Sequence, residues 1–391
     1  MRATTLDKLY FDSDEKQIKE CLNTFLQDVK YSLANKKTED ALIDDILRDD
    51  TPINATLYEV YSKNLRRAVD KVFYEDNGNG LSDCLRANVS RFAAYKAYHA
   101  TQQVREQIAK DGDMDRGRMV LHAFNRYQAA EYNTAVSRCR TAKQFEEFSA
   151  PDNMRLFPNL RWLPSRSATP REQHMLFYNR VWAKDDPFWA QNQPGNLWNC
   201  KCDWEETSDP VTDGNPTAPI RHDGLEGNPA QTRQIFSDNC AYVKNSGQNK
   251  REKYRIKQLV NNMARHSTIK NGRYLYNKKV SMKILNDKFV EVEFNSDSIS
   301  HFANDFIKTK EFWLKNELIQ ILEKDLSKSK LVGWEENTKL DKKPTHEIYY
   351  YYKTRLPNGE IAFYSIYKNR VTGKYLFYAI SKTLRETANL V

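Results

Sequence analysis

Long apolar segments are absent from this sequence of 391 residues. No run approaches the roughly 18 apolar residues that a membrane-spanning helix needs, and the mean hydropathy is −0.80. The N-terminal stretch MRATTLDKLYFDSDEK lacks the apolar core of a signal peptide. We therefore expect no membrane span and a protein that is made and kept in a cytoplasm.

A chain of this length can bury a sizeable core, and we expect two or three domains.

Cysteine is also scarce. The six cysteines are too few and too scattered for a disulfide framework. They are Cys21, Cys84, Cys139, Cys200, Cys202 and Cys240.

Positive charge is present in excess but is unevenly distributed. Residues 250–391 contain 28 Lys and Arg against 16 Asp and Glu, a net charge of +12, whereas residues 1–249 contain 33 against 36, a net charge of −3. A basic domain on a near-neutral carrier suggests a polyanion, most often nucleic acid, as the partner of the C-terminal part. The alternative is that this charge serves solubility alone.

Residues 1–150 are predicted to be largely helical. Apolar residues recur at three- and four-residue steps over 16–34, which is the spacing of one helix face. Similar patterns cover 56–73 and 82–110, and the turn residues EDNGNG separate them.

Residues 161–202 differ from the helical part. They contain seven aromatic residues, four prolines, a histidine and a Cys-x-Cys pair. Proline removes a backbone donor and biases the preceding residue to an extended geometry, so a single helix is excluded. We predict a compact, irregular element of short strands and turns, ordered by the burial of its large aromatic side chains.

The motifs of this segment carry a resemblance. The order W-LPSRSATPRxxH, then DDPFW, then PxNxWNCKC resembles the minor head proteins of tailed phages typified by the F protein of phage Mu (the MuF, or head-morphogenesis, family). The resemblance extends more weakly upstream to about residue 50. It implies a structural role near the portal, with phage portal and capsid proteins as partners. It also implies residence in a bacterial cytoplasm during assembly, and afterwards in the virion.

Three interpretations of His174, Cys200 and Cys202 are open. With a carboxylate such as Asp185 or Asp186 they could hold a zinc ion. The cysteines could instead pack as small buried side chains while His174 donates to a backbone carbonyl. A Cys–His nucleophile pair is the third option, but no orienting residue or oxyanion signature accompanies it. We expect the packing role, with no metal and no cofactor.

The composition shifts again after the aromatic segment. The stretch SDPVTDGNPTAPIRHDGLEGNPAQTRQ has four prolines and almost no apolar periodicity, which predicts a linker or extended arm. The basic helix KREKYRIKQLVNNMARHS follows. We therefore assign residues 1–207 to a first domain, helical over 1–150 and aromatic over 151–207, and residues 208–264 to the linker and basic helix.

Residues 265–391 are predicted to form a separate α+β domain. Two short strands and two helices are expected over 272–326, followed by strands over 346–356, 360–368 and 374–381. The turns Pro357-Asn358-Gly359 and Thr372-Gly373 are hairpin signals. The last strands would form an antiparallel sheet with one face on the helices. The fold class of the chain is therefore α+β.

This order of elements resembles the barnase–EndoU–colicin–RelE group of small ribonucleases, in particular its phage-borne members fused to MuF-type head proteins. The matching motifs are HFANDF, YYYYKTR, FYSIYK and FYAIS. The resemblance implies metal-independent RNA cleavage, in which the ribose 2′-OH attacks the adjacent phosphate. Such chemistry needs a base, an acid and cations on the developing phosphorane charge. RNA and an immunity protein are the partners that it implies.

Candidate residues follow from these needs. His301 is predicted to be the general base or acid, one turn before Asp305, which could orient its imidazole. Lys353 and Arg355 share one face of their strand and are predicted to contact the phosphate, with Ser381 as an orienting group. Tyr378 completes the catalytic set. The candidates for substrate binding, where tyrosines would stack on bases, are His346, Tyr352, Tyr364, Lys368 and Thr383.

Two functions are consistent with these patterns. In the first, the chain is a minor head protein that carries a C-terminal ribonuclease toxin, ejected into a host with the genome or released against competitors. In the second, the chain is purely structural, and its basic C-terminal domain binds packaged DNA or virion partners. His301 would then pack or cap its helix, and the basic residues would form a solvated sheet face.

Overall fold

The computed structural model of the protein describes residues 36–74, 80–110, 112–217, 223–304 and 311–391. The helix expected over 16–34 lies outside the described residues. By its contacts the chain forms two compact units, Met1–Asn77 with Asn88–Val260 and Gly78–Ala87 with Asn261–Val391. We call them the N-terminal and C-terminal units. Helices and sheets are both present, so the α+β class is confirmed.

Helices, of which α3, α4 and α6 are amphipathic, form the first part of the N-terminal unit. In α4 the side chain of Asn54 caps the helix by accepting from the Leu57 N–H at 3.0 Å. Its apolar face, which includes Tyr61 and Leu65, packs towards α7. The helices are α3 (Lys36–Arg48), α4 (Ala55–Val72), α5 (Gly80–Ile108), α6 (Met114–Arg126) and α7 (Gln128–Phe148). The first residues of α5, up to Ala87, are assigned to the C-terminal unit.

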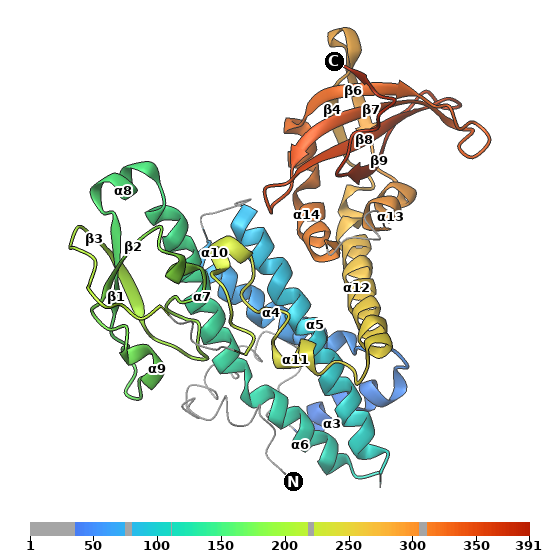
Figure 1. The fold of residues 1–391 in the computed structure, drawn as a ribbon. Helices are drawn as coiled ribbons and strands as arrows, with labels where there is room; N and C mark the ends of the chain where they lie inside the picture. The colour runs from blue at the N-terminus through green and yellow to red at the C-terminus, as the bar shows by residue number, and fades with distance from the viewer. Residues whose placement is uncertain (1–35, 75–79, 111, 218–222, 305–310) are drawn as a thin grey trace. The chain divides into compact units, whose positions relative to one another are not determined.

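The aromatic segment is a small three-stranded sheet with short helices around it (Figure 1). The central strand β1 pairs antiparallel with both β2 and β3. Stacked and edge-to-face rings fill the core, as in the pair Trp182 and Phe188 at 4.2 Å. The elements are α8 (Pro151–Leu156), β1 (Asn159–Leu163), α9 (Glu172–Met175), β2 (Val181–Ala183), η1 (Pro187–Ala190) and β3 (Asp203–Thr207).

Residues 223–249 are packed into the N-terminal unit, so the linker expected over 208–264 is corrected for this stretch. Buried Arg138 donates to the carbonyls of Leu225 at 2.9 Å and Gly227 at 3.0 Å. Asn88 binds both backbone groups of Phe236. Polar side chains on helices thus satisfy a backbone that has little secondary structure of its own, which composition did not reveal. Two short helices, α10 (Pro229–Thr232) and α11 (Ala241–Lys244), precede the basic helix α12 (Lys250–Gly272).

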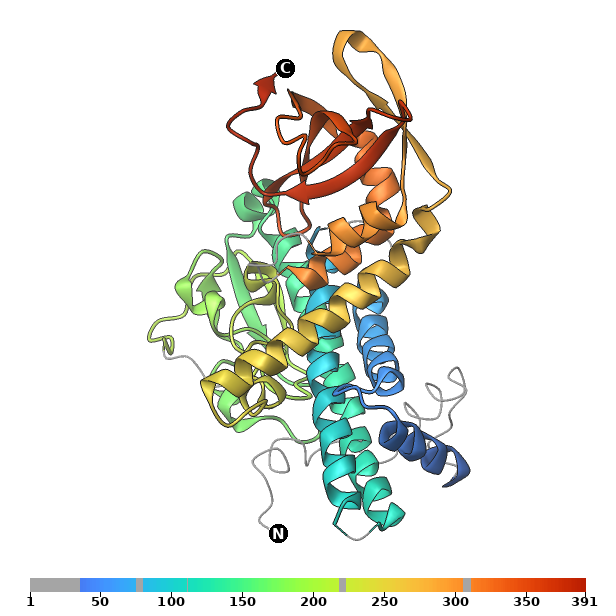
Figure 2. The ribbon, with the colours of Figure 1, turned by 90° about the vertical axis from the view of Figure 1, so that its right-hand side faces the viewer.

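The C-terminal unit contains one mixed sheet with the strand order β10-β6-β7-β8-β9-β5-β4. Neighbours pair antiparallel except β5 and β9, which are parallel. Figures 1 and 2 show α13 and α14 on one side of this sheet. The elements are η2 (Arg273–Leu275), β4 (Lys279–Lys283), η3 (Leu285–Asp287), β5 (Phe289–Glu293), α13 (Ser296–Asn304), α14 (Phe312–Lys328), β6 (Lys330–Glu336), β7 (His346–Arg355), β8 (Ile361–Asn369), β9 (Tyr375–Ser381) and β10 (Asn389–Leu390).

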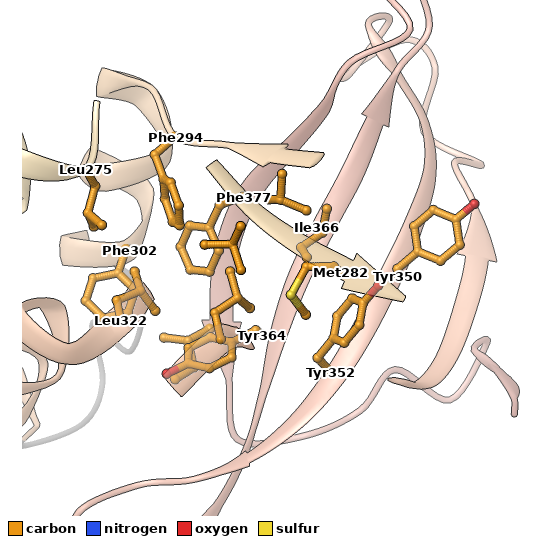
Figure 3. Close-up of a cluster of buried hydrophobic side chains, with 14 of the residues drawn as sticks. Leu275, Met282, Phe294, Phe302, Leu322, Tyr350, Tyr352, Tyr364, Ile366 and Phe377 are labelled. Carbon is orange, nitrogen blue, oxygen red and sulfur yellow. The ribbon is translucent and has the colours of Figure 1, made fainter. Parts of the chain in front are cut away.

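The core of the C-terminal unit lies between these two helices and the sheet. Figure 3 shows Phe302 and Leu322 from the helices together with Tyr364, Ile366 and Phe377 from the strands. Each of these five side chains is fully buried. Burial of large apolar groups stabilises the unit, and it also decides which face of each strand remains for other roles.

Candidate active site

The two faces of β7 separate the core from the candidate site. Alternate residues of a strand point to opposite faces, so Tyr350 and Tyr352 enter the helix-facing core while Tyr349 and Tyr351 lie on the other face. The second face carries its own buried cluster, which consists of Tyr349, Tyr351, Tyr367 and Leu376, with Tyr378 packed against it. The face turned away from the helices is therefore rich in aromatic groups.

His346 begins β7 and is held against this face. Its ring stacks on Tyr367, with the ring centroids 3.7 Å apart and the planes 8° from parallel. Its Nδ1 lies 2.7 Å from the hydroxyl of Tyr349. The stack and the hydrogen bond fix the orientation of the imidazole, and proton transfer to a ligand would use Nε2.

His301 comes from α13 and approaches the same place. The neighbouring Phe302 anchors that helix in the core, while His301 itself is exposed. The His301 ring lies 4.7 Å from the ring of Tyr378, and the His346 ring lies 5.3 Å from it on an edge-to-face contact. Tyr378 thus contacts both histidines.

A lysine completes the group. Lys343, in the loop before β7, places its ammonium 4.0 Å from the centroid of the Tyr378 ring, which is cation–π geometry. We define the histidine–tyrosine cluster as His301, Lys343, His346, Tyr349, Tyr367 and Tyr378. It joins two imidazoles, one ammonium and three phenols, all of which can bind or move protons.

The electrostatics of the cluster favour a neutral His346. Burial, together with the charge of Lys343 and a smaller contribution from His301, lowers the pKa of His346 to about 4. Burial raises the pKa of Tyr349 to about 12. At neutral pH the pair is therefore an uncharged imidazole beside a protonated phenol. In the tautomer whose Nδ1–H donates to the Tyr349 oxygen, Nε2 can accept a proton.

A second polar network borders the cluster. The hydroxyl of Tyr351 donates to Glu335 at 2.5 Å, and Arg385 and Thr387 also donate to that carboxylate. Burial raises the pKa of Glu335, but these hydrogen bonds and the charge of Arg385 outweigh burial and hold it below its usual value. Arg385 also lies 5.5 Å from the ring of Tyr349. Arg385 and Thr387 thus bind to the sheet face that carries the histidine–tyrosine cluster.

Lys353 and Arg355 do not join the histidines, so the prediction that grouped them with His301 is corrected. They share the face of Tyr351, but His346 and Lys353 lie seven residues apart on β7, which corresponds to about 20 Å. Arg355 donates to the carbonyl of Gly359 at 2.8 Å and so holds its own hairpin. The two basic residues and the histidines are suitable residue types, but their positions at opposite ends of β7 keep them apart.

The predicted orienting group and its neighbour lie at the same distant end. Ser381 pairs with Phe363, which in turn pairs with Lys353 across the sheet. The Ser381 hydroxyl donates to the carbonyl of Thr383 at 2.8 Å. The structure therefore brings neither Ser381 nor Thr383 to the histidines.

Three predicted substrate contacts occupy the opposite face of the sheet. Tyr352 and Tyr364 are 1% and 0% exposed, and their hydroxyls donate to the Lys283 carbonyl and to Asp325. They belong to the core and cannot stack on bases. Lys368 pairs across the sheet with Ile348 and Tyr375, which both pack against the core, and its ammonium forms an ion pair with Glu347. These three assignments are corrected, because alternation along the strands turns them towards the helices.

The structure thus brings together His301, His346 and Tyr378 from the predicted set. Asp305, the expected partner of His301, lies outside the described residues. The sequence reasoning missed Lys343, Tyr349 and Tyr367. Strand alternation starting from His346 could have placed Tyr349 beside it only if the register irregularity between His346 and Ile348 had been known.

A different cluster in the N-terminal unit contains potential metal ligands. His174, Cys200 and Cys202 are buried, and their ligand atoms lie within 4.8 Å of one another. A hydrogen bond from Cys200, with His174 nearby, lowers the pKa of Cys202 to about 5, whereas the same hydrogen bond and burial raise the pKa of Cys200. We call these three residues the histidine–cysteine cluster.

Comparisons of the chain with protein-family models, with curated proteins and with solved structures found no match. The resemblances to phage minor head proteins and to small ribonucleases therefore stay predictions. Among the described residues, no helix is long and apolar enough to cross a membrane.

Proposed function

We propose that the C-terminal unit cleaves RNA without a metal ion, and that His346 and His301 are its acid–base pair. The observation that supports this most strongly is the contact of both imidazoles with one tyrosine, Tyr378, beside the ammonium of Lys343. Two histidines and a cation at one place supply the base, the acid and the charge stabilisation that attack by a ribose 2′-OH requires.

The proton roles follow from the surroundings of each imidazole. His346 is uncharged at physiological pH because its pKa is lowered. With Nδ1–H donating to the Tyr349 oxygen, its Nε2 takes the proton from the 2′-OH. The freed oxygen attacks the phosphorus, and the bond to the 5′-oxygen breaks. His301, which is exposed and contacts Tyr378, gives a proton to that leaving oxygen. The products are a cyclic phosphate and a free 5′-hydroxyl.

Binding of the substrate would use charge and ring stacking. The ammonium of Lys343 lies over the ring of Tyr378, which contacts both histidines, so it could stabilise the charge that develops on the phosphorane. Tyr378 is half-buried and could stack on a base. The net charge of +12 over residues 250–391 attracts RNA over a longer range.

The N-terminal unit is the proposed head-protein part of the chain. Its support is the motif order of the aromatic segment, whose small sheet and short helices form a compact element. Portal and capsid proteins would be its partners, and the ribonuclease would travel as cargo in the virion. Mass spectrometry of purified particles of the encoding phage tests this, because absence of the chain from virions would contradict it.

A structural role for the C-terminal unit is the second candidate. The exposed basic residues Lys353 and Arg355 lie far from the histidine–tyrosine cluster, so a polyanion could bind the sheet without any cleavage. Packaged DNA would be the ligand in that case. Binding of DNA and RNA with equal affinity, together with intact RNA, would favour this candidate.

The deciding experiment measures RNA cleavage by the purified full-length chain in EDTA. His346→Ala and His301→Ala are each expected to slow cleavage by about 10²- to 10⁴-fold, because each removes one proton-transfer group. His266→Ala is the matched control, since His266 is an exposed histidine on α12. Cleavage that survives in both cluster variants, or that requires a divalent cation, would refute the proposed mechanism.

A further inference from the structure

The histidine–cysteine cluster has the geometry of a metal site. The Sγ atoms of Cys200 and Cys202 lie 3.3 and 3.5 Å from Nδ1 of His174. In a tetrahedral zinc site, with Zn–S near 2.3 Å and Zn–N near 2.0 Å, neighbouring ligand atoms are about 3.5 Å apart. The three side chains therefore converge at the spacing that one zinc ion would impose.

The tautomer of His174 is set for coordination. Its Nε2 lies 2.8 Å from Oδ1 of Asn196, and the Nδ2 amide of Asn196 donates to the carbonyl of Gln191. That second bond fixes which end of the amide faces the histidine, so Nε2 carries the proton and donates it. The lone pair of Nδ1 then points towards the two sulfurs. An outer hydrogen bond of this kind orients a metal-bound histidine.

The backbone and the surrounding rings also suit a thiolate site. The N–H of Cys202 is directed at Sγ of Cys200 at 3.4 Å, and a donor aimed at sulfur stabilises the charge of a thiolate. The ring of Trp162 lies edge-on to His174 at 5.0 Å. His174, Cys200 and Cys202 are 0%, 6% and 6% exposed, so the apolar shell keeps solvent from most of the site.

A cross-link at this position has a physical reason. The strands around it contain only three to five residues each, and the bonded pairs join residues 26 and 28 positions apart. An irregular element with so little regular hydrogen bonding gains much of its stability from a shared ion. Without one, the core would hold three polar atoms that face one another at a cost in free energy.

We propose that His174, Cys200 and Cys202 bind a zinc ion that stabilises the N-terminal unit. Thiolate and imidazole ligands favour Zn²⁺ over Mg²⁺ or Ca²⁺. Within the described residues the group comprises these three side chains, and Asp186 instead caps η1 through the Phe188 N–H. The fourth ligand is then a water molecule or a group from another molecule. Asn196 is a positioning residue, because it acts through His174.

The test begins with the metal content and free thiols of the full-length chain, purified under reducing conditions without chelators. One zinc per chain is expected. Cys202→Ser and Cys200→Ser should each lose it, whereas Cys139→Ala should keep it, since Cys139 is a buried cysteine outside the cluster. Wild-type protein without bound metal, or with a Cys200–Cys202 disulfide in its place, would overturn the proposal. So would zinc that remains in the Cys200→Ser, Cys202→Ser double variant.

Two further measurements do not depend on whether those variants fold. Replacement of zinc by Co²⁺ in the wild-type chain should produce sulfur-to-cobalt charge-transfer absorption, and a spectrum without it contradicts thiolate ligation. Asn196→Ala should still bind one zinc but release it to a competing chelator at about 10- to 100-fold lower concentration. An unchanged competition curve would show that Asn196 has no positioning role.

Discussion

The two histidine clusters of this protein place the same side chain in opposite surroundings. His174 is fully buried between two thiols, and its second nitrogen donates to Asn196. His346 is half-buried, stacks on Tyr367 and meets one tyrosine hydroxyl. Both nitrogens of His174 are engaged by protein groups. For His346, only Nδ1 has a hydrogen bond of that kind among the described residues.

The difference shows how neighbours select the chemistry of an imidazole. Soft sulfur ligands in an apolar shell favour a static metal-binding role. Phenols, an ammonium and partial exposure favour proton transfer, because a substrate can reach the ring and the ring can change its protonation. Loss of the first histidine should therefore affect stability, and loss of the second should affect activity.

The largest effect on stability is expected for His174→Ala. Removal of a fully buried ring that bonds three side chains should lower the free energy of unfolding of the N-terminal unit by about 2–5 kcal/mol. His346→Ala should cost only about 1–2 kcal/mol, since its side chain is half-buried and loses one stack and one hydrogen bond. Chemical denaturation of the full-length chain, followed by tryptophan fluorescence, measures the first change. An equal loss of unfolding free energy in His174→Ala and His346→Ala would contradict the different roles proposed for the two clusters.

A pH dependence of stability is expected next. The folded pKa of His346 is about 4, below its ordinary value of 6.5, so the unfolded chain binds more protons between these values. The stabilising contribution is therefore complete above pH 6.5 and is lost as the pH falls towards 4. The slope stays below about 1.4 kcal/mol per pH unit, and partial exposure reduces it. Melting curves of wild type and His346→Gln should diverge in this window, and parallel curves would contradict the lowered pKa.

Tyr349→Phe is expected to have a smaller effect. The change removes the hydroxyl that meets Nδ1 of His346 and should lower the free energy of unfolding by about 0.5–1.5 kcal/mol. The pH–rate profile of RNA cleavage should shift at its acidic limb, because Tyr349 acts through the imidazole. A uniform loss of rate at every pH would indicate a merely structural role. Tyr254→Phe serves as a control, since Tyr254 is exposed on α12.

The smallest effect is expected for Lys353→Ala combined with Arg355→Ala. Both side chains are exposed and lie far from the histidines, so stability should change by no more than about 0.5 kcal/mol. Cleavage should stay within about twofold at saturating RNA. Loss of cleavage comparable to that of His346→Ala would place the site at the other end of β7 and overturn the cluster as the active site.

The strands of the C-terminal unit show how far sequence patterns reach. The hairpin signals located β7, β8 and β9, and the apolar periodicity located α14. In the run YYYYKTR, alternation requires two tyrosines on each face, but four identical residues do not reveal which two. Tyr352 was therefore expected at the surface and lies in the core. Strand β6 was missed, because its short sequence KLVGWEE carries weak alternation.

The packed loops show a second limit. Proline content and the lack of apolar periodicity predicted a linker where residues 223–249 are in fact held by Arg138 and Asn88. A loop can be rigid when distant side chains satisfy its backbone, and composition within the loop carries no trace of those partners.

Sequence alone determined the basic C-terminal part, the helical periodicities, the aromatic segment and the types of residue available for chemistry. Tertiary structure decided which of them meet. It joined His301 to His346 through Tyr378, and it turned one imidazole of the N-terminal unit towards two sulfurs. The physical reason is that sheet register and helix packing join residues far apart in the chain, and neither is encoded in local spacing.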